Sequence, residues 1–91
     1  SGDEAVELIL KKNPDIVLMD LVLPKKNGIE VTKEVLEKNP NIKIIACSTE
    51  TQDGMLVQAI HAGCLGFITK PFEAEKVIQT IKDVHSKKRS S

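Results

Sequence analysis

The chain has 91 residues, and its thirteen basic and thirteen acidic side chains give a formal net charge of zero. This length suits one small domain, and a neutral chain has no general electrostatic attraction to nucleic acid or to an anionic membrane. The sequence holds no apolar run long enough to span a bilayer and no signal-peptide pattern. We therefore expect a cytoplasmic protein that binds neither a membrane nor nucleic acid directly.

The first predicted element is an amphipathic helix from Asp3 to about Lys12. Asp3 is its predicted N-cap, Asn13-Pro14 ends it, and Ser1-Gly2 before it are consistent with a cloning remnant. Helical spacing places Ala5, Leu8, Ile9 and Lys12 on the predicted inward face and Glu4, Glu7 and Lys11 on the outward face.

A continuous apolar run from Ile16 to Met19 predicts the first strand. An unbroken run of this kind is typical of a strand that is covered on both faces, as in a parallel sheet. Asp20 follows at the predicted carboxyl end of this strand, which is where ligands bind in open α/β sheets. A simpler interpretation is that Asp20 only caps a turn ahead of Pro24.

Turn residues separate this strand from a second predicted helix. Pro24 and Asn27-Gly28 predict a loop over 21–27, and the helix then runs from Gly28 or Ile29 to Lys38, where Asn39-Pro40-Asn41 breaks it. Its predicted inward positions are Ile29, Thr32, Val35 and Leu36.

Two further pairs of strand and helix follow. Residues 43–48 form a short apolar strand that ends in the hydroxyl of Ser48, and residues 52–62 form a helix with Gly63 as its C-cap. Residues 66–69 form a third strand that ends at Lys70-Pro71. The last predicted helix covers 73–87, and its apolar stripe holds Ala74, Val77, Ile81 and Val84. Residues 86–91 are expected to form a flexible tail.

Helices and strands therefore alternate along the whole chain. This order predicts an α/β fold with a parallel sheet of three strands, right-handed crossovers and four helices on the sheet faces. The carboxyl ends of parallel strands share one edge, so we expect Asp20, Ser48 and Lys70 to lie close together.

An acid, a hydroxyl and an ammonium around one point suit a phosphoryl group. A carboxylate can accept phosphoryl covalently, a hydroxyl can donate to a phosphoryl oxygen, and a lysine can neutralise the added charge. Taken singly, Ser48 and Lys70 have ordinary explanations, because serine is common at strand ends and most lysines are solvated. The combination is more specific than either residue.

The chain resembles the receiver domain of two-component response regulators, with the flavodoxin-like, chemotaxis-regulator (CheY-like) fold. The resemblance covers residues from Asp3 to about His85. It is carried by the segment from Pro14 to Asp20, by Pro24, Gly28 and Ser48, and by the segment from Ala62 to Phe72.

This resemblance implies a role for each matching residue. Asp20 corresponds to the phosphoacceptor, which takes its phosphoryl group from a histidine kinase, so the chain is expected to act in signalling and not as an enzyme. Ser48 corresponds to the switch hydroxyl, Lys70 to the phosphate-binding lysine, and Phe67 to the aromatic side chain whose rotamer follows phosphorylation. A magnesium ion is implied at Asp20 and the backbone carbonyl of Val22, and Pro71 suggests a cis peptide bond after Lys70.

The family pattern begins with a strand that ends in an acidic pair, followed by a helix and a second strand, and this chain starts after that unit. We therefore expect a partial receiver domain over residues 1–91 that binds magnesium weakly or not at all and has impaired phosphorylation. The Asp20 strand becomes an edge strand, which favours a homo-oligomer that pairs through it.

Other functions stay open from the sequence. The main alternative is a truncated, self-associating structural half-domain with a vestigial site. A phosphatase with an aspartyl nucleophile usually carries a second aspartate where Val22 stands, and a cobalamin-binding domain needs a histidine in a strand-end loop, whereas His61 and His85 fall on predicted helices.

The remaining reactive and aromatic residues exclude further classes. Cys47 and Cys64 are too few for a disulfide framework or a zinc knuckle, and their apolar surroundings predict buried free thiols. Phe67 and Phe72 are the only aromatic residues, which excludes a base-stacking platform.

Overall fold

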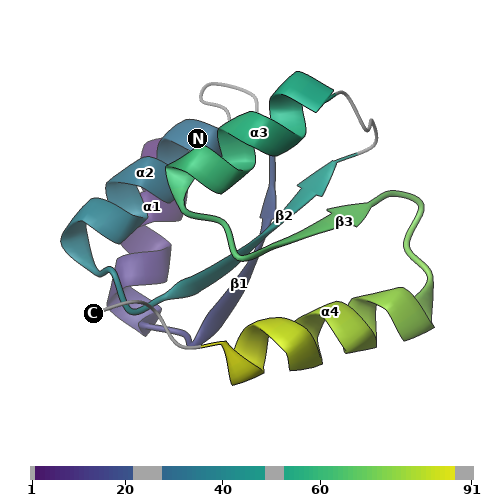
Figure 1. Ribbon diagram of the computed structural model, residues 1–91. Coiled ribbons are helices and arrows are strands. Elements are labelled where there is room, and N and C mark those ends of the chain that lie inside the picture. Colours follow the sequence, from purple (N-terminus) through teal and green to yellow (C-terminus); the bar gives the residue numbers. More distant parts are fainter. Residues whose placement is uncertain (1, 22–27, 49–52, 88–91) are drawn as a thin grey trace.

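The computed structural model describes residues 2–21, 28–48 and 53–87, and it contains seven alternating elements (Figure 1). The predicted alternation of helix and strand is confirmed, with boundaries within one residue of those expected. The elements are α1 Gly2–Lys12, β1 Ile16–Asp20, α2 Gly28–Lys38, β2 Lys43–Ser48, α3 Asp53–Ala62, β3 Gly66–Thr69 and α4 Ala74–Ser86.

The three strands form one parallel sheet in the order β1-β2-β3. In its register Ile16 lies beside Lys43, and Ile45 lies beside Gly66. The predicted three-stranded α/β fold is therefore confirmed. All three strands point the same way in Figure 1, so their carboxyl ends share one edge of the sheet.

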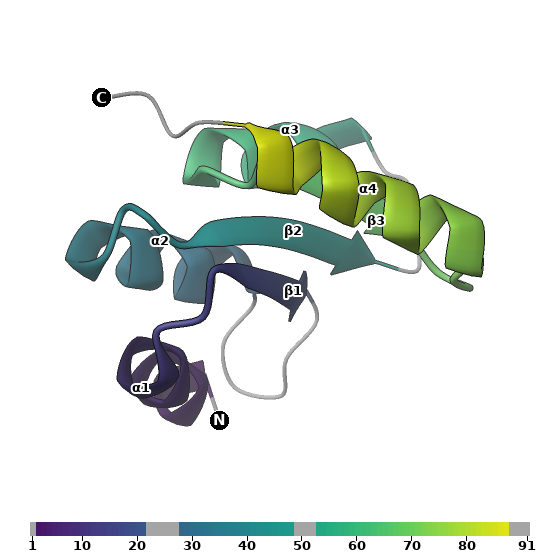
Figure 2. The same ribbon diagram turned by 90° about the horizontal axis from the view of Figure 1, so that it is seen from below.

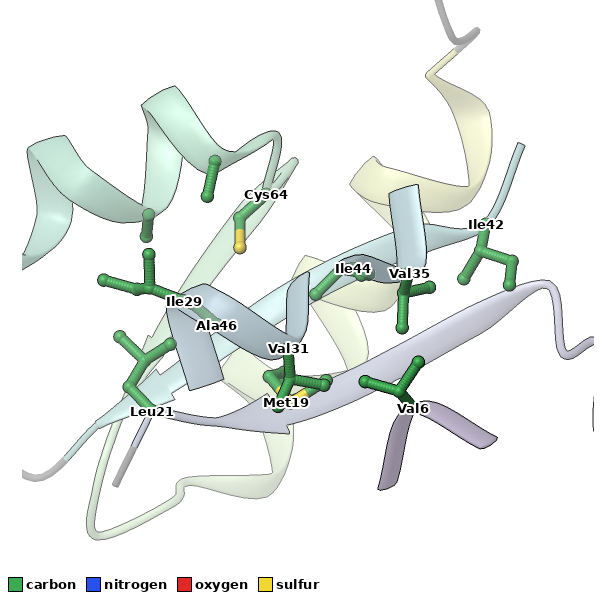
Figure 3. Close-up of a cluster of buried hydrophobic side chains, with 12 residues drawn as sticks. Val6, Met19, Leu21, Ile29, Val31, Val35, Ile42, Ile44, Ala46 and Cys64 are labelled. Carbon is green, nitrogen blue, oxygen red and sulfur yellow. The ribbon is translucent and has the colours of Figure 1, made fainter. Parts of the chain in front are cut away.

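The helices cover the two faces of the sheet unequally. Helices α1, α2 and α3 lie on one face and α4 alone lies on the other (Figures 1 and 2). The larger core fills the space under the first three helices (Figure 3), and its buried members are Val6, Met19, Leu21, Ile29, Val31, Val35, Ile42, Ile44, Ala46, Ala59, Ala62 and Cys64.

A smaller core lies between α4 and the sheet, and its buried members are Ile45, Cys47, Ile68 and Val84. Helix α4 packs on β3 and β2. Because it packs mainly on these two strands, Leu18 on β1 is left 48% exposed. The prediction that the first strand is covered on both faces is therefore wrong at Leu18, whereas its position at the sheet edge is as expected.

The predicted inward face of the first helix is only partly confirmed, because Ala5 and Ile9 pack against the larger core but Leu8 and Lys12 are exposed. Val6 is 4% exposed and belongs to the larger core, whereas Leu8 is 53% exposed. Helix α1 packs mainly against α2, and this brings Val6 into the core in place of Leu8. The helix also begins at Gly2, which places Asp3 inside it and not at the N-cap.

Several local predictions are confirmed. Helix α1 ends before Asn13-Pro14, and α2 ends before Asn39. Gly63 has a φ of 110°, the left-handed conformation that suits a helix C-cap, and the Lys70-Pro71 peptide bond is cis. In the described part of the chain, no helix has both the length and the apolar character needed to cross a membrane.

Candidate functional site

The carboxyl ends of the three strands are tied together by backbone hydrogen bonds. The amide of Leu21, just after β1, donates to the carbonyl of Cys47 on β2 at 3.0 Å. The amide of Lys70, just after β3, donates to the carbonyl of Ser48 at 2.8 Å. These bonds extend the ladders by one residue on each side, so Asp20, Ser48 and Lys70 are held at one edge of the sheet.

An ion pair joins the two outer strands of this edge. The Lys70 Nζ donates to Asp20 Oδ2 at 2.7 Å, although the chain separates the two residues by 50 positions. The Lys70 side chain therefore crosses the end of β2 to reach β1. The side chains of Lys70 and Asp20 are 30% and 44% exposed, so the pair is open to solvent and to an incoming ligand.

The other two residues with predicted roles have distinct surroundings. Ser48 ends β2 and is only 2% exposed, so a hydroxyl is buried at the site edge. Phe67 lies on β3, is half-buried and packs against the larger core. The structure thus places Asp20 and Lys70 in contact, Ser48 on the strand between them and Phe67 against the adjoining core.

Gly28 packs directly on the backbone that carries Asp20. Its amide donates to the carbonyl of Leu21 at 3.0 Å, which returns the chain to the strand end at the start of α2. A Cβ atom at this position would lie 2.3 Å from the Asp20 carbonyl oxygen and 2.8 Å from the Leu21 Cα. Only glycine allows this approach. The sequence predicted a turn here but not the contact with Asp20.

Cys47 lies beside Asp20 in the sheet register and is 2% exposed. Burial raises the pKa of its thiol, the Lys70 ammonium lowers that pKa, and the Asp20 carboxylate raises it further. Burial is the largest of these effects. The thiol is therefore held neutral beside the site, and both Cys47 and Cys64 are buried free thiols, as predicted.

The described residues offer little to a metal ion. They contain no group of three histidine, cysteine, aspartate or glutamate side chains placed to hold one. Val22 and Pro24 lie outside the described residues. Magnesium prefers octahedral oxygen coordination, so the carboxylate of Asp20 alone does not make a protein-built magnesium site.

Sequence reasoning gave no role to Phe72. Its ring centroid lies 5.9 Å from Lys70 Nζ, within the range of a cation–π contact. The ring is 51% exposed and so contributes little to the core. Phe72 follows Lys70 by two positions in the sequence, and this closeness was the one sign in the sequence that the two side chains could meet.

A family model, the response regulator receiver domain, matches residues 1–82 of the chain. Among curated proteins, the chemotaxis protein CheY of Thermotoga maritima is 44% identical over 84 residues, which cover 92% of this chain and 70% of that protein.

Solved structures give the same result. A LuxR-family two-component response regulator from Aurantimonas sp. SI85-9A1 superposes with a TM-score of 0.89 at 28% identity, and the match covers 100% of this chain and 65% of that one. The response regulator domain of Thermotoga maritima CheB superposes with a TM-score of 0.84 at 31% identity, over 96% of this chain and 72% of the other.

Proposed function

The chain belongs to the response regulator receiver domain family, and on that premise we propose that it accepts a phosphoryl group on Asp20 in two-component signalling. The observation that carries this proposal is the 2.7 Å contact between Lys70 Nζ and Asp20 Oδ2 at the carboxyl edge of the sheet. The partner is a histidine kinase, and the chain acts in the cytoplasm as an acceptor and switch, without turnover of its own.

In the proposed reaction, an Asp20 carboxylate oxygen attacks the phosphorus of the donor and forms a new P–O bond. With a phosphohistidine donor the P–N bond breaks and the electron pair stays on the imidazole nitrogen. With a small acyl phosphate the carboxylate leaves instead. Lys70 neutralises the negative charge that arrives with the phosphoryl group, and Ser48 donates its hydroxyl to a phosphoryl oxygen.

Phe67 is the proposed reporter of this change. It lies on β3, three positions before Lys70, and is half-buried against the larger core. A rearrangement at Ser48 and Lys70 can be accommodated by a new rotamer of this ring, which is the switch implied for the family. Direct binding to nucleic acid is not part of the proposal, since the formal net charge is zero.

Magnesium is proposed to bind weakly. The family implies such an ion, and Asp20 and the carbonyl of Val22 are its expected ligands. Because the described residues supply a single carboxylate at the strand ends, most of the ion's coordination has to come from water and from phosphoryl oxygens. We therefore propose that phosphorylation of this 91-residue chain is slow.

The experiment is intact-mass spectrometry after incubation with acetyl phosphate and magnesium. We expect one added phosphoryl group in the wild-type chain and none in Asp20→Asn. Asp15→Asn is the matched control, because Asp15 is exposed and lies just before the same strand. The same addition in Asp20→Asn, or no addition in any chain, contradicts the proposal.

We propose as a second candidate role that the chain self-associates through the outer edge of β1. The backbones of Asp15 and Leu21 bond to β2. Along a strand the backbone groups of successive residues point alternately to one side and the other, and Leu18 lies an odd number of positions from both residues. Its own N–H and C=O therefore face away from β2. Its side chain is also 48% exposed, so this strand presents an apolar, open edge of the kind that pairs with other chains.

Light scattering after size-exclusion chromatography tests this role. We expect a dimer that dissociates on dilution, and a shift to monomer in Leu18→Lys, because a charge on an edge strand opposes pairing. The control is Leu56→Lys on α3, where the side chain is similarly exposed at 40%. A wild-type chain that stays monomeric at every concentration contradicts the role.

A further inference from the structure

Among the described residues, the Lys70 ammonium contacts the Asp20 carboxylate and the ring of Phe72. The first is a hydrogen-bonded ion pair at 2.7 Å, and the second is a ring centroid at 5.9 Å. Phe72 is 51% exposed and belongs to neither buried cluster, so its burial contributes little to packing. An exposed aromatic side chain beside a functional ammonium calls for an explanation other than packing.

Lysine is poorly fixed by an exposed ion pair alone. Its stem has several rotatable bonds, and solvent-exposed pairs hold a single geometry only weakly. The Lys70 side chain is 30% exposed and its partner Asp20 is 44% exposed, so the ion pair belongs to this weak class. A second contact that favours the same position of the ammonium raises the fraction of time that it spends at the site.

We infer that Phe72 is a positioning residue, whose ring holds the Lys70 ammonium beside Asp20 and thereby increases the rate of phosphoryl transfer to that carboxylate. The negative face of an aromatic ring attracts a cation, and at exposed sites this attraction changes a population by about two- to fivefold. The inference rests on the proposed function of Asp20, but the contact between Phe72 and Lys70 can be measured separately.

The first test uses two substitutions of Phe72 and a control substitution of Ile78. Phe72→Leu keeps an apolar side chain but removes the ring, and Phe72→Trp keeps a ring. The control, Ile78→Ala, changes a similarly exposed apolar residue, 52% exposed, on the helix α4 that follows. With acetyl phosphate as donor, we expect the initial phosphorylation rate to fall about two- to fivefold in Phe72→Leu and to be kept in Phe72→Trp and Ile78→Ala.

The second test asks whether the effect passes through Lys70. In a chain that carries Lys70→Met, the further substitution Phe72→Leu is expected to leave the rate unchanged, because the ring no longer has a cation to hold. A purely structural role of Phe72 predicts instead the same fold loss in both backgrounds, and that result overturns the inference.

A third measurement does not depend on activity. A ring that lies over the lysine head shields the Lys70 ε-methylene protons, so their NMR resonance is expected to move downfield in Phe72→Leu and to stay upfield in Phe72→Trp. Unchanged shifts in Phe72→Leu overturn the contact.

If the wild-type chain takes no phosphoryl group while these shifts move as expected, the proposed function and its rate effect fail but the contact stands. If the wild type is phosphorylated and Phe72→Leu keeps its rate, only the positioning role fails.

Discussion

The ammonium of Lys70 and the carboxylate of Asp20 lie 2.7 Å apart although they come from the ends of the two outer strands, with β2 between them. This distance depends on two strand pairings and on a side chain long enough to cross β2. The contact is thus a product of the whole sheet, and it places a cation beside the carboxylate that is proposed to accept phosphoryl.

Removal of this cation is expected to affect transfer more than folding. In Lys70→Met we expect phosphorylation by acetyl phosphate to slow by a factor on the order of 10², as for the loss of a group that stabilises developing charge. Because both partners are substantially exposed, the free energy of unfolding is expected to change by less than about 1 kcal/mol. Initial rates and urea denaturation measure the two effects, with Lys76→Met on α4 as control. A loss of several kcal/mol in the free energy of unfolding contradicts the expectation that Lys70 affects transfer more than folding.

Gly28 is expected to tolerate no larger residue. In Gly28→Ala the new methyl group would meet the Asp20 carbonyl oxygen and the Leu21 Cα, which are backbone atoms and cannot rotate away. We expect a loss of about 1–3 kcal/mol in the free energy of unfolding. Gly54→Ala is the matched control, because nothing lies within 4 Å of its added Cβ and alanine favours a helix. Equal stability of the two variants contradicts the close approach.

The centre of the larger core is expected to dominate stability. Ile44 is fully buried, so Ile44→Ala removes contacts and leaves a cavity, at a cost of about 2–5 kcal/mol. In a small domain this is a large part of the total stability. Ile60→Ala removes as many atoms from a side chain that is 60% exposed, and we expect a change within about 0.5 kcal/mol. Chemical denaturation of both variants measures this difference in the free energy of unfolding, and equal losses contradict the central role of the Ile44 side chain in stability.

The Cys47 thiol predicts a loss of stability in alkaline solution. Burial raises the pKa of this thiol in the folded chain, so the unfolded chain loses the proton at lower pH. The stabilisation is complete below about pH 8.5 and is lost as pH rises through the folded pKa, with a slope of at most about 1.4 kcal/mol per pH unit. Denaturation under reducing conditions between about pH 8 and 10 should therefore show a steeper decline in the wild type than in Cys47→Ala. Parallel pH curves contradict the assignment.

The sequence predicted the sheet and the closeness of Asp20 and Lys70 well, because both follow from local patterns in the chain. Apolar runs and turn residues set the limits of every element, and alternation of strand and helix leaves few alternatives to a parallel sheet. Once the sheet is parallel, Asp20 and Lys70 must share an edge. Helix ends at Lys12, Lys38 and Ala62 follow from the adjacent asparagine, proline and glycine residues.

The errors arise where burial depends on the partner of an element and not on the element itself. Leu8 and Val6 are both apolar, and only the packing of α1 against α2 decides that Val6 is buried. Leu18 sits in a continuous apolar run, yet α4 packs mainly on β3 and β2 and leaves it exposed. The contact of Phe72 with Lys70 also depends on side-chain placement that no periodicity records.

The register of the sheet governs how the chain reaches its fold. Ile16 pairs beside Lys43 and Ile45 beside Gly66, so each strand meets its neighbour only after the chain has passed through a whole helix. No ladder can start from a tight turn, and the entropy of closing each loop is lost before the contacts compensate for it. We therefore expect topology to limit the rate of refolding, since β1 can pair with β2 only after the chain between them has closed.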